Sequence, residues 1–156
     1  MRIMFVCHGN ICRSPMAEII MRELVKRAGL SNKISVASSA TSTEEIGNPV
    51  YPPARRELLR HSLSSDGKYA VQLTRADYEK YDYFIGMDSA NIRNMHRIFG
   101  SDTEGKILKL LELTDTGGDV ADPWYTGGFD VTYADCLRGC EALISLYDKD
   151  ADCLML

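Results

Sequence analysis

Residues 6–15 read VCHGNICRSP, and this stretch decides how the rest of the sequence is interpreted. It follows the short apolar run Arg2–Val6, which predicts a buried strand. A polar loop that contains glycine comes next. Ser14 and Pro15 then predict the start of a helix, because serine is a good N-cap and proline suits the first helical position.

The elements that follow predict a parallel sheet. Apolar spacing continues the helix to Ala28, Gly29 suits its C-cap, and Lys33–Ser38 reads as a second strand. A strand, helix and strand in this order imply parallel pairing with a right-handed crossover. Further along we expect strands at 82–87 and 106–111, helices at 54–61, 89–99 and 131–148, a short helix from a capping box at 74–77 to 81, and loops at 38–53 and 114–129. The prediction is an α/β fold, a doubly wound four-stranded parallel sheet with helices on both faces.

Composition points to one ordinary domain spanning residues 1–156, with 45% hydrophobic and 26% charged residues. A net charge of −4 gives no basic excess, so no nucleic-acid partner is expected. The first apolar run ends at Cys7, which is too short for a signal peptide or a membrane span. We therefore expect a cytoplasmic protein without a membrane partner.

The cysteines predict neither a disulfide framework nor a zinc site. There are five, at positions 7, 12, 136, 140 and 153. An odd number at irregular spacing is a poor disulfide framework, and a reducing compartment keeps them as thiols. No two-residue cysteine spacing recurs and no histidine pair accompanies it, so no metal is expected.

The loop after the first strand is the candidate site, because ligands of an open parallel sheet bind beyond the carboxyl ends of its strands. Free N–H groups at the start of the following helix favour an anion, and successive loop N–H groups form an anion-binding nest. Gly9 permits unusual backbone angles. Arg13 adds a planar charged fork that suits phosphate oxygens.

Cys7 opens this positive loop and is the candidate nucleophile. A cysteine near a helix N-terminus and an arginine is expected to be largely thiolate near neutral pH, and a thiolate beside a dianion site is aimed at phosphorus. We expect Ser14 to donate a hydrogen bond to the sulfur and Asn10 to brace the loop by bonding to its own backbone. The alternative is a buried core thiol with Arg13 solvated at the helix start. The position between a strand and a helix favours the catalytic interpretation.

Residues 6–18, VCHGNICRSPMAE, resemble the signature of the low-molecular-weight protein tyrosine phosphatases. The resemblance continues in order along essentially the whole chain, at residues 40–42, 46–49, 82, 87–91 and 122–125. It implies a four-stranded parallel sheet with flanking helices. It also implies hydrolysis of a phosphotyrosine-containing protein or a small phosphomonoester, without metal or cofactor.

By position, the resemblance implies that Cys7 attacks phosphorus and becomes phosphocysteine, while Arg13 and the loop amides hold the phosphoryl oxygens. The phosphate-binding loop residues are then His8, Gly9, Asn10, Ile11, Cys12 and Ser14. Asp122 resembles the general acid, a role that suits a tyrosine leaving group with a pKa of about 10. The same carboxylate would later activate water. Taken alone, Asp122 and Pro123 are also a common turn.

Three further residues carry two interpretations each. Trp124 and Tyr125 are either core aromatics or, as we prefer, an aromatic wall for a flat phosphotyrosine ring. Asp88 caps the helix that starts at Ser89, and in the family this position lies near the arginine.

Two departures from the family pattern affect the pocket entrance and the loop brace. Relatives often carry an aromatic or bulky group near Glu44, whereas Glu44 and Glu45 here predict an acidic entrance that favours basic peptides. Lys68 lies in a stretch where relatives often carry histidine and arginine. A charged lysine cannot accept the hydrogen bond that a bracing histidine accepts.

Three other functions remain open from the sequence. An arsenate reductase of the same fold relays electrons through two further cysteines on a mobile segment, whereas Cys136 and Cys140 are expected on the core side of the last helix. A phosphoarginine phosphatase tends to have threonine where this chain has Ile11, and the apolar Ile11 suits an aromatic ring better. A silent phosphate-binding module would not need both Cys7 and Asp122.

Cys12 supports a separate hypothesis about oxidation. It lies in the same loop as Cys7, and loop curvature would allow a disulfide that protects Cys7 from irreversible oxidation. The alternative is that Cys12 only packs the loop.

Overall fold

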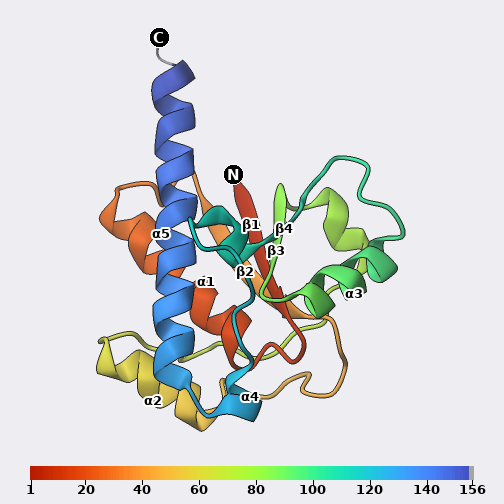
Figure 1. Ribbon diagram of the computed structural model, residues 1–156, viewed down its shortest axis with the longest axis vertical. Coiled ribbons are helices and arrows are strands. Elements are labelled where there is room, and N and C mark those ends of the chain that lie inside the picture. Colours follow the sequence, from red (N-terminus) through yellow and green to blue (C-terminus); the bar gives the residue numbers. More distant parts are fainter. Residues whose placement is uncertain (155–156) are drawn as a thin grey trace.

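The computed structural model describes residues 1–154, with side chains described as far as Tyr147, and it contains the predicted four-stranded parallel sheet (Figure 1). The strand order is β2-β1-β3-β4. The strands are β1 (Arg2–Cys7), β2 (Ser35–Ala40), β3 (Tyr83–Gly86) and β4 (Ile107–Lys109), and each neighbouring pair is parallel. β1 is almost continuously apolar because it is central and covered on both faces.

Helices cover both faces of the sheet, as the sequence predicts. The apolar side chains of β1 alternate between two clusters: Ile3, Phe5 and Cys7 join one, and Met4 and Val6 join the other. The first cluster lies under α1 (Arg13–Arg27), α2 (Pro52–Arg60) and α5 (Phe129–Leu154). The second lies under α3 (Ser89–Phe99) and the 3-10 helix η1 (Arg75–Glu79). Cys7 therefore ends β1 on the α1 and α5 side.

Several predicted boundaries are wrong, each for a local reason. Ser14 is not the N-cap of α1, because the helix begins at Arg13 after Cys12 and no side chain caps it. β2 extends to Ala40 rather than ending at Ser38, because residues 38–40 pair with β1 although their serines resemble a loop. β4 ends at Lys109, where the chain turns into the 3-10 helix η2 (Leu110–Leu113).

The loop predicted at 114–129 contains a short helix, α4 (Pro123–Thr126), which starts with proline as helices often do. The last helix, expected to end at Asp148, continues in α5 to Leu154. The side chain of Cys153 and residues 155–156, the end of the expected single domain, lie outside the described residues.

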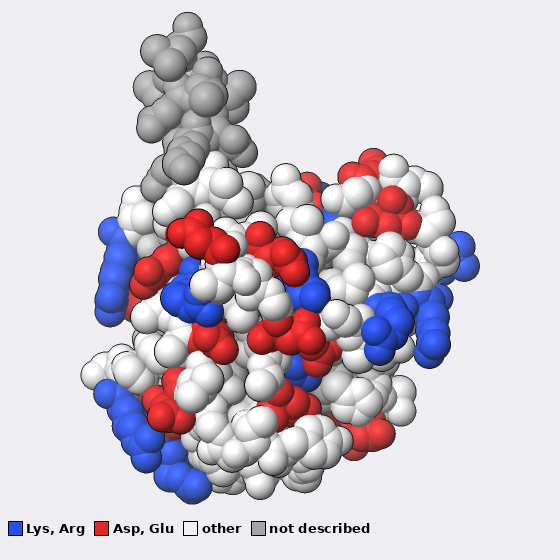
Figure 2. Space-filling model, in the orientation of Figure 1, with Lys and Arg blue, Asp and Glu red and all other residues white. Residues whose placement is uncertain are grey.

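The surface is mixed in charge. On the face that Figure 2 shows, acidic and basic side chains are interspersed, in keeping with the net charge of −4. None of the helices in the described part of the chain combines the length and apolar character that crossing a membrane requires.

Candidate active site

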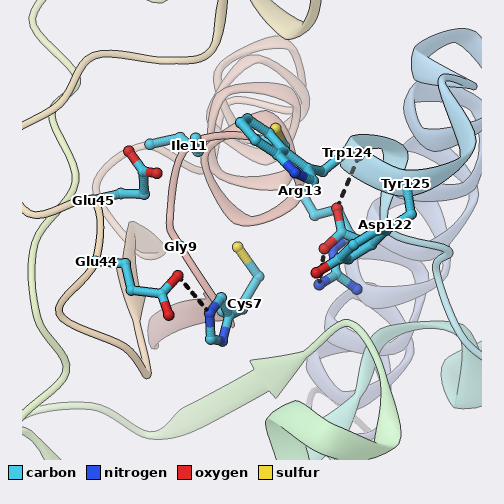
Figure 3. Close-up of a pocket in the computed structure, with 11 residues that line it drawn as sticks. Cys7, Gly9, Ile11, Arg13, Glu44, Glu45, Asp122, Trp124 and Tyr125 are labelled. Carbon is cyan, nitrogen blue, oxygen red and sulfur yellow. Dashed lines mark hydrogen bonds and ion pairs between the residues drawn. The ribbon is translucent and has the colours of Figure 1, made fainter.

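A pocket opens where the strands end at their carboxyl side, and three chain segments line it (Figure 3). The segments are the loop after β1, the loop after β2 and the start of α4. The lining residues are Cys7, His8, Gly9, Ile11, Cys12, Arg13, Glu44, Glu45, Asp122, Trp124 and Tyr125. Two predicted site residues, Asn10 and Ser14, are instead buried behind the loop. The structure thus brings Cys7, Arg13, Asp122 and the two aromatic residues into one pocket, with Asn10 and Ser14 behind it.

The Cys7 sulfur is held from behind by two groups. Its Sγ lies 3.0 Å from Ser14 Oγ and accepts a hydrogen bond from the Asn10 backbone N–H at 3.3 Å. Cys7 itself is 3% exposed, so its one free side faces the pocket. This arrangement points the sulfur towards a bound ligand.

Asn10 shapes the loop in a way that the sequence did not predict. The left-handed backbone angle falls on Asn10, with φ of 59°, and not on Gly9. The Asn10 side chain does not bond to its own loop backbone. Its Oδ1 accepts the Val71 N–H at 3.1 Å, and its Nδ2 donates to Ser14 Oγ at 2.7 Å and to Ser38 Oγ at 2.9 Å.

These contacts fix the orientation of the Asn10 side-chain amide. The Val71 N–H is only a donor, so the Asn10 amide oxygen must face it and the amide nitrogen must face the two serines. Each serine hydroxyl therefore accepts from Asn10 and is free to donate elsewhere. The Ser14 hydroxyl is thus free to donate to Cys7 Sγ, and the Ser38 hydroxyl donates to Glu18 Oε1, 2.6 Å away.

The hydrogen bonds that join Asn10, Ser38 and Glu18 brace the loop from behind. Lys68 completes this brace by donating rather than accepting. Its Nζ donates to the Ser38 carbonyl oxygen at 3.0 Å and lies 3.3 Å from Glu18 Oε1. Glu18 is 5% exposed and also binds Arg22. Neither Glu18 nor Ser38 was among the expected site residues. A signal for Glu18 was present, since an acidic residue one helical turn after Ser14 interrupts an apolar face.

Arg13 is 2% exposed and is held by two elements besides its own. Its NH1 donates to Asp88 Oδ2 at 2.7 Å and to the Val120 carbonyl at 2.9 Å, and its NH2 lies 3.5 Å from Asp122 Oδ2. Burial alone would lower the pKa of the Arg13 guanidinium, but the charges of Cys7, Asp88 and Asp122 outweigh it and raise the pKa. Arg13 is therefore a permanent cation beneath the pocket.

Asp88 fulfils both of its predicted roles. It caps α3 by accepting the Asn91 N–H at 2.8 Å, and it binds Arg13. Burial would raise the pKa of the Asp88 carboxyl, but the hydrogen bonds from Arg13 and Asn91 outweigh it and lower the pKa. The carboxylate is thus a fixed counter-ion for Arg13.

Asp122 and the aromatic residues form the opposite wall of the pocket. Asp122 caps α4 by accepting the Trp124 N–H at 3.0 Å, so the turn and the site geometry coincide. Trp124 is 53% exposed and Tyr125 is 84% exposed, so neither is a core residue. Tyr51 supports the Trp124 ring at a centroid distance of 4.8 Å. Glu44 and Glu45 lie on the other side of Cys7 (Figure 3), where Glu44 Oε2 is 3.2 Å from His8 Nε2.

The other described cysteines differ from Cys7. Burial, followed by the charges of Cys7 and Asp122, raises the pKa of Cys12 to about 12, so Cys12 is a thiol at neutral pH. Cys136 and Cys140 are fully buried on α5, and burial raises the pKa of both. Because they lie on the buried face of α5, in the protein core, they do not suit a mobile electron relay. The disulfide between Cys7 and Cys12 stays a prediction.

Comparisons with known proteins identify one family for this chain. The family model described as "Low molecular weight phosphotyrosine protein phosphatase" matches residues 2–152. YfkJ of Bacillus subtilis, named as a low molecular weight protein-tyrosine-phosphatase, is 38% identical over 150 residues, covering 95% of this chain and 96% of the relative. PtpA of Staphylococcus saprophyticus, which has the same family name, is 38% identical over 151 residues, covering 96% of each.

Solved structures agree with these sequence relatives. The crystal structure of Bacillus subtilis YfkJ superimposes with a TM-score of 0.93 and covers 96% of each chain. The arginine phosphatase YwlE, in a variant with a phosphorylated active-site serine in place of cysteine, superimposes with a TM-score of 0.84 at 28% identity. That alignment covers 96% of this chain and 97% of YwlE.

The brace behind the loop generates a stability prediction. Lys68→Met leaves the buried Glu18 carboxylate with fewer partners, and we expect it to lower the free energy of unfolding by about 1–3 kcal/mol. Urea denaturation measures the change. Lys106→Met is the matched control: the Lys106 side chain is equally shielded at 14% exposure and also donates to a backbone carbonyl, that of Tyr78, but its acidic partner Glu104 is 59% exposed rather than buried. Equal losses in the two variants would contradict the brace.

Proposed function

Because the chain belongs to the low molecular weight phosphotyrosine protein phosphatase family, we propose that it hydrolyses phosphotyrosine through a phosphocysteine intermediate on Cys7. One observation carries the proposal: a single pocket holds the Cys7 sulfur, the buried Arg13 cation and the Asp122 carboxyl group. These are a nucleophile, an oxyanion clamp and a proton donor. We propose residues 1–156 as one phosphatase domain in a reducing, cytoplasmic compartment.

In the first half of the proposed reaction, the Cys7 thiolate attacks phosphorus. The S–P bond forms as the P–O bond to the tyrosine breaks, and Asp122 gives its proton to the departing phenolate oxygen. Arg13 and the N–H groups of loop 7–13 stabilise the charge on the three phosphoryl oxygens, most strongly in the transition state. Because Arg13 and these amides supply the positive charge, the proposal assigns no step to a metal.

In the second half, Asp122 acts as a base and removes a proton from the attacking water. The new P–O bond forms as the S–P bond breaks, releasing inorganic phosphate and restoring the thiolate. The hydrogen of Ser14, aimed at Sγ, stabilises the negative charge that returns to the sulfur. A phosphorylated active-site residue in the YwlE variant supports a phosphoenzyme in this fold.

Phosphotyrosine is the proposed substrate over phosphoarginine for two reasons. The exposed Trp124 and Tyr125 rings offer a flat apolar wall, and Ile11 adds an apolar side chain to the same pocket. YfkJ and PtpA carry tyrosine phosphatase names at 38% identity, whereas the arginine phosphatase YwlE is 28% identical.

The first functional prediction concerns the nucleophile and the acid. Phosphate release from a phosphotyrosine peptide should exceed release from matched phosphoserine and phosphoarginine peptides, and Cys7→Ser should abolish it. Asp122→Asn should lower kcat by about 10²- to 10⁴-fold, the usual contribution of general acid–base catalysis. Steady-state assays with the purified full chain measure these rates.

Circular dichroism of both variants confirms that they remain folded. Release that survives Cys7→Ser would overturn the mechanism, and a phosphoarginine preference would overturn only the substrate assignment.

The second functional prediction concerns Glu44 and Glu45 at the pocket entrance. Both line the pocket, and the Glu44 side chain is 70% exposed, so a cationic residue beside the phosphotyrosine should be attracted. We expect peptides with flanking lysine to have kcat/KM values about two- to fivefold above those with flanking glutamate at low salt, as for exposed ion pairs. The preference should shrink as the salt concentration rises.

Replacing both residues, Glu44→Gln with Glu45→Gln, should remove the preference. The charge-matched control is Glu79→Gln with Glu141→Gln, at exposed positions outside the pocket lining. Loss of the preference in the control as well would mean that net charge, and not the entrance, sets it.

A further inference from the structure

Lys109 is a shielded cation that the proposed reaction does not use. It ends β4, and its side chain is 17% exposed. Its Nζ lies 2.9 Å from Asp119 Oδ1, donates to Ser89 Oγ at 3.0 Å and lies 3.8 Å from Glu112 Oε1. These contacts join the end of β4 to the start of α3 and to the segment that leads to α4 (Figure 1).

That segment carries Asp122, and within it Val120 is fully buried in the main core whereas Asp119 is half-exposed. Gly117 and Gly118 both have positive φ values, of 62° and 91°, so the chain turns sharply just before Asp119. Val120 is then anchored twice, through its N–H to the Met87 carbonyl at 2.9 Å and through its own carbonyl to Arg13 NH1 at 2.9 Å.

Arg13 makes two of the contacts that position this segment, and it also binds the substrate in the proposed reaction. They are the Arg13 bond to the Val120 carbonyl and the 3.5 Å contact with Asp122. Asp122 must leave this contact to reach the leaving oxygen. The ion pair between Lys109 and Asp119 contacts neither the pocket lining nor Arg13, so a substrate bound to Arg13 does not compete with it.

We propose that Lys109 is a positioning residue, which holds the Asp122 segment through Asp119 so that the carboxyl group reaches the leaving oxygen. This inference rests on the proposed function. The hydrogen bond to Asp119 also raises the pKa of Lys109, which keeps the ammonium charged over the working range of pH. Asp119 is 49% exposed, so the pair adds little to global stability and its removal leaves the fold intact.

A misplaced acid has a signature that a general structural defect lacks. A poor leaving group such as phenolate, with a pKa of about 10, needs the proton, whereas the far more acidic dinitrophenolate leaves without it. The value of kcat/KM reports the steps up to leaving-group departure. Loss of positioning should therefore lower kcat/KM for phenyl phosphate and spare it for dinitrophenyl phosphate.

The experiment measures kcat/KM for both aryl phosphates in the wild type, Lys109→Met, Lys109→Arg and Asp119→Asn. We expect Lys109→Met and Asp119→Asn each to lose about three- to fivefold on phenyl phosphate, as for a partly exposed ion pair, and to be nearly unchanged on dinitrophenyl phosphate. Lys109→Arg should restore most of the loss. The double variant should lose no more than either single one, because both remove the same contact.

Two controls separate this contact from its neighbours. Lys106→Met removes an equally shielded lysine beside the same strand, and Glu112→Gln removes the more distant acidic partner of Lys109. Both should leave the ratio of the two kcat/KM values unchanged. Asp122→Asn should show the leaving-group dependence in its full size.

Each result decides between the inference and its premise. If Asp122→Asn shows the dependence and Lys109→Met does not, the positioning role is overturned while the proposed function stands. If Lys109→Met lowers both substrates equally, its role is structural and the inference is overturned. If Asp122→Asn lacks the dependence, Asp122 is not the acid, and the proposed function fails together with the inference.

Discussion

The hydrogen bond between the Val71 N–H and the Asn10 side-chain oxygen sets the polarity of the whole site. A backbone N–H can only donate, so the Asn10 amide oxygen must face Val71. The amide nitrogen must then face the two serine hydroxyls. Ser14 is left with a single hydrogen to give, and Cys7 Sγ lies 3.0 Å away to receive it. A contact to a residue 61 positions along the chain thus leaves the Ser14 hydrogen free to be donated to the sulfur. Asn10, Ser14 and Cys7 are all buried, where an unpaired polar group costs most.

The same brace explains why Lys68 is compatible with the fold. A lysine cannot replace a histidine as an acceptor, but this network needs no acceptor at that point. The Ser38 carbonyl and the Glu18 carboxylate are both acceptors, and the Lys68 ammonium donates to the first and neutralises the second. Glu18 is stable inside the protein because lysine, serine and arginine groups surround it. The brace therefore needs a cation at this position and not a hydrogen-bond acceptor.

Local sequence patterns predicted the sheet, the helices on its two faces and the loop that holds Cys7 and Arg13, because apolar period and helix-start residues are short-range signals. They failed where distant contacts decide the conformation. Ser39 resembles a loop residue because it is polar, but it pairs with Val6 of β1 and is buried. Gly9 was expected to permit unusual backbone angles, but the left-handed angle belongs to Asn10, whose side chain is fixed by Val71 and Ser38. Lys109 gave no local signal, since its partner Asp119 lies beyond a turn.

Arg13 contacts two carboxylates, those of Asp88 and Asp122, at different distances, and this difference suits them to different roles. Asp88 receives a 2.7 Å hydrogen bond from the guanidinium and a second from the Asn91 N–H, and both stabilise its charged form. Asp122 lies 3.5 Å from the same guanidinium, at the pocket wall and at the start of a four-residue helix. A carboxylate with strong fixed donors is a poor proton carrier, whereas one with a long contact can release the cation and take up a proton. In the proposed mechanism the short bond fixes the Arg13 guanidinium, and the long contact leaves Asp122 free to protonate the leaving group. A site with two short bonds would hold phosphate well and turn it over slowly.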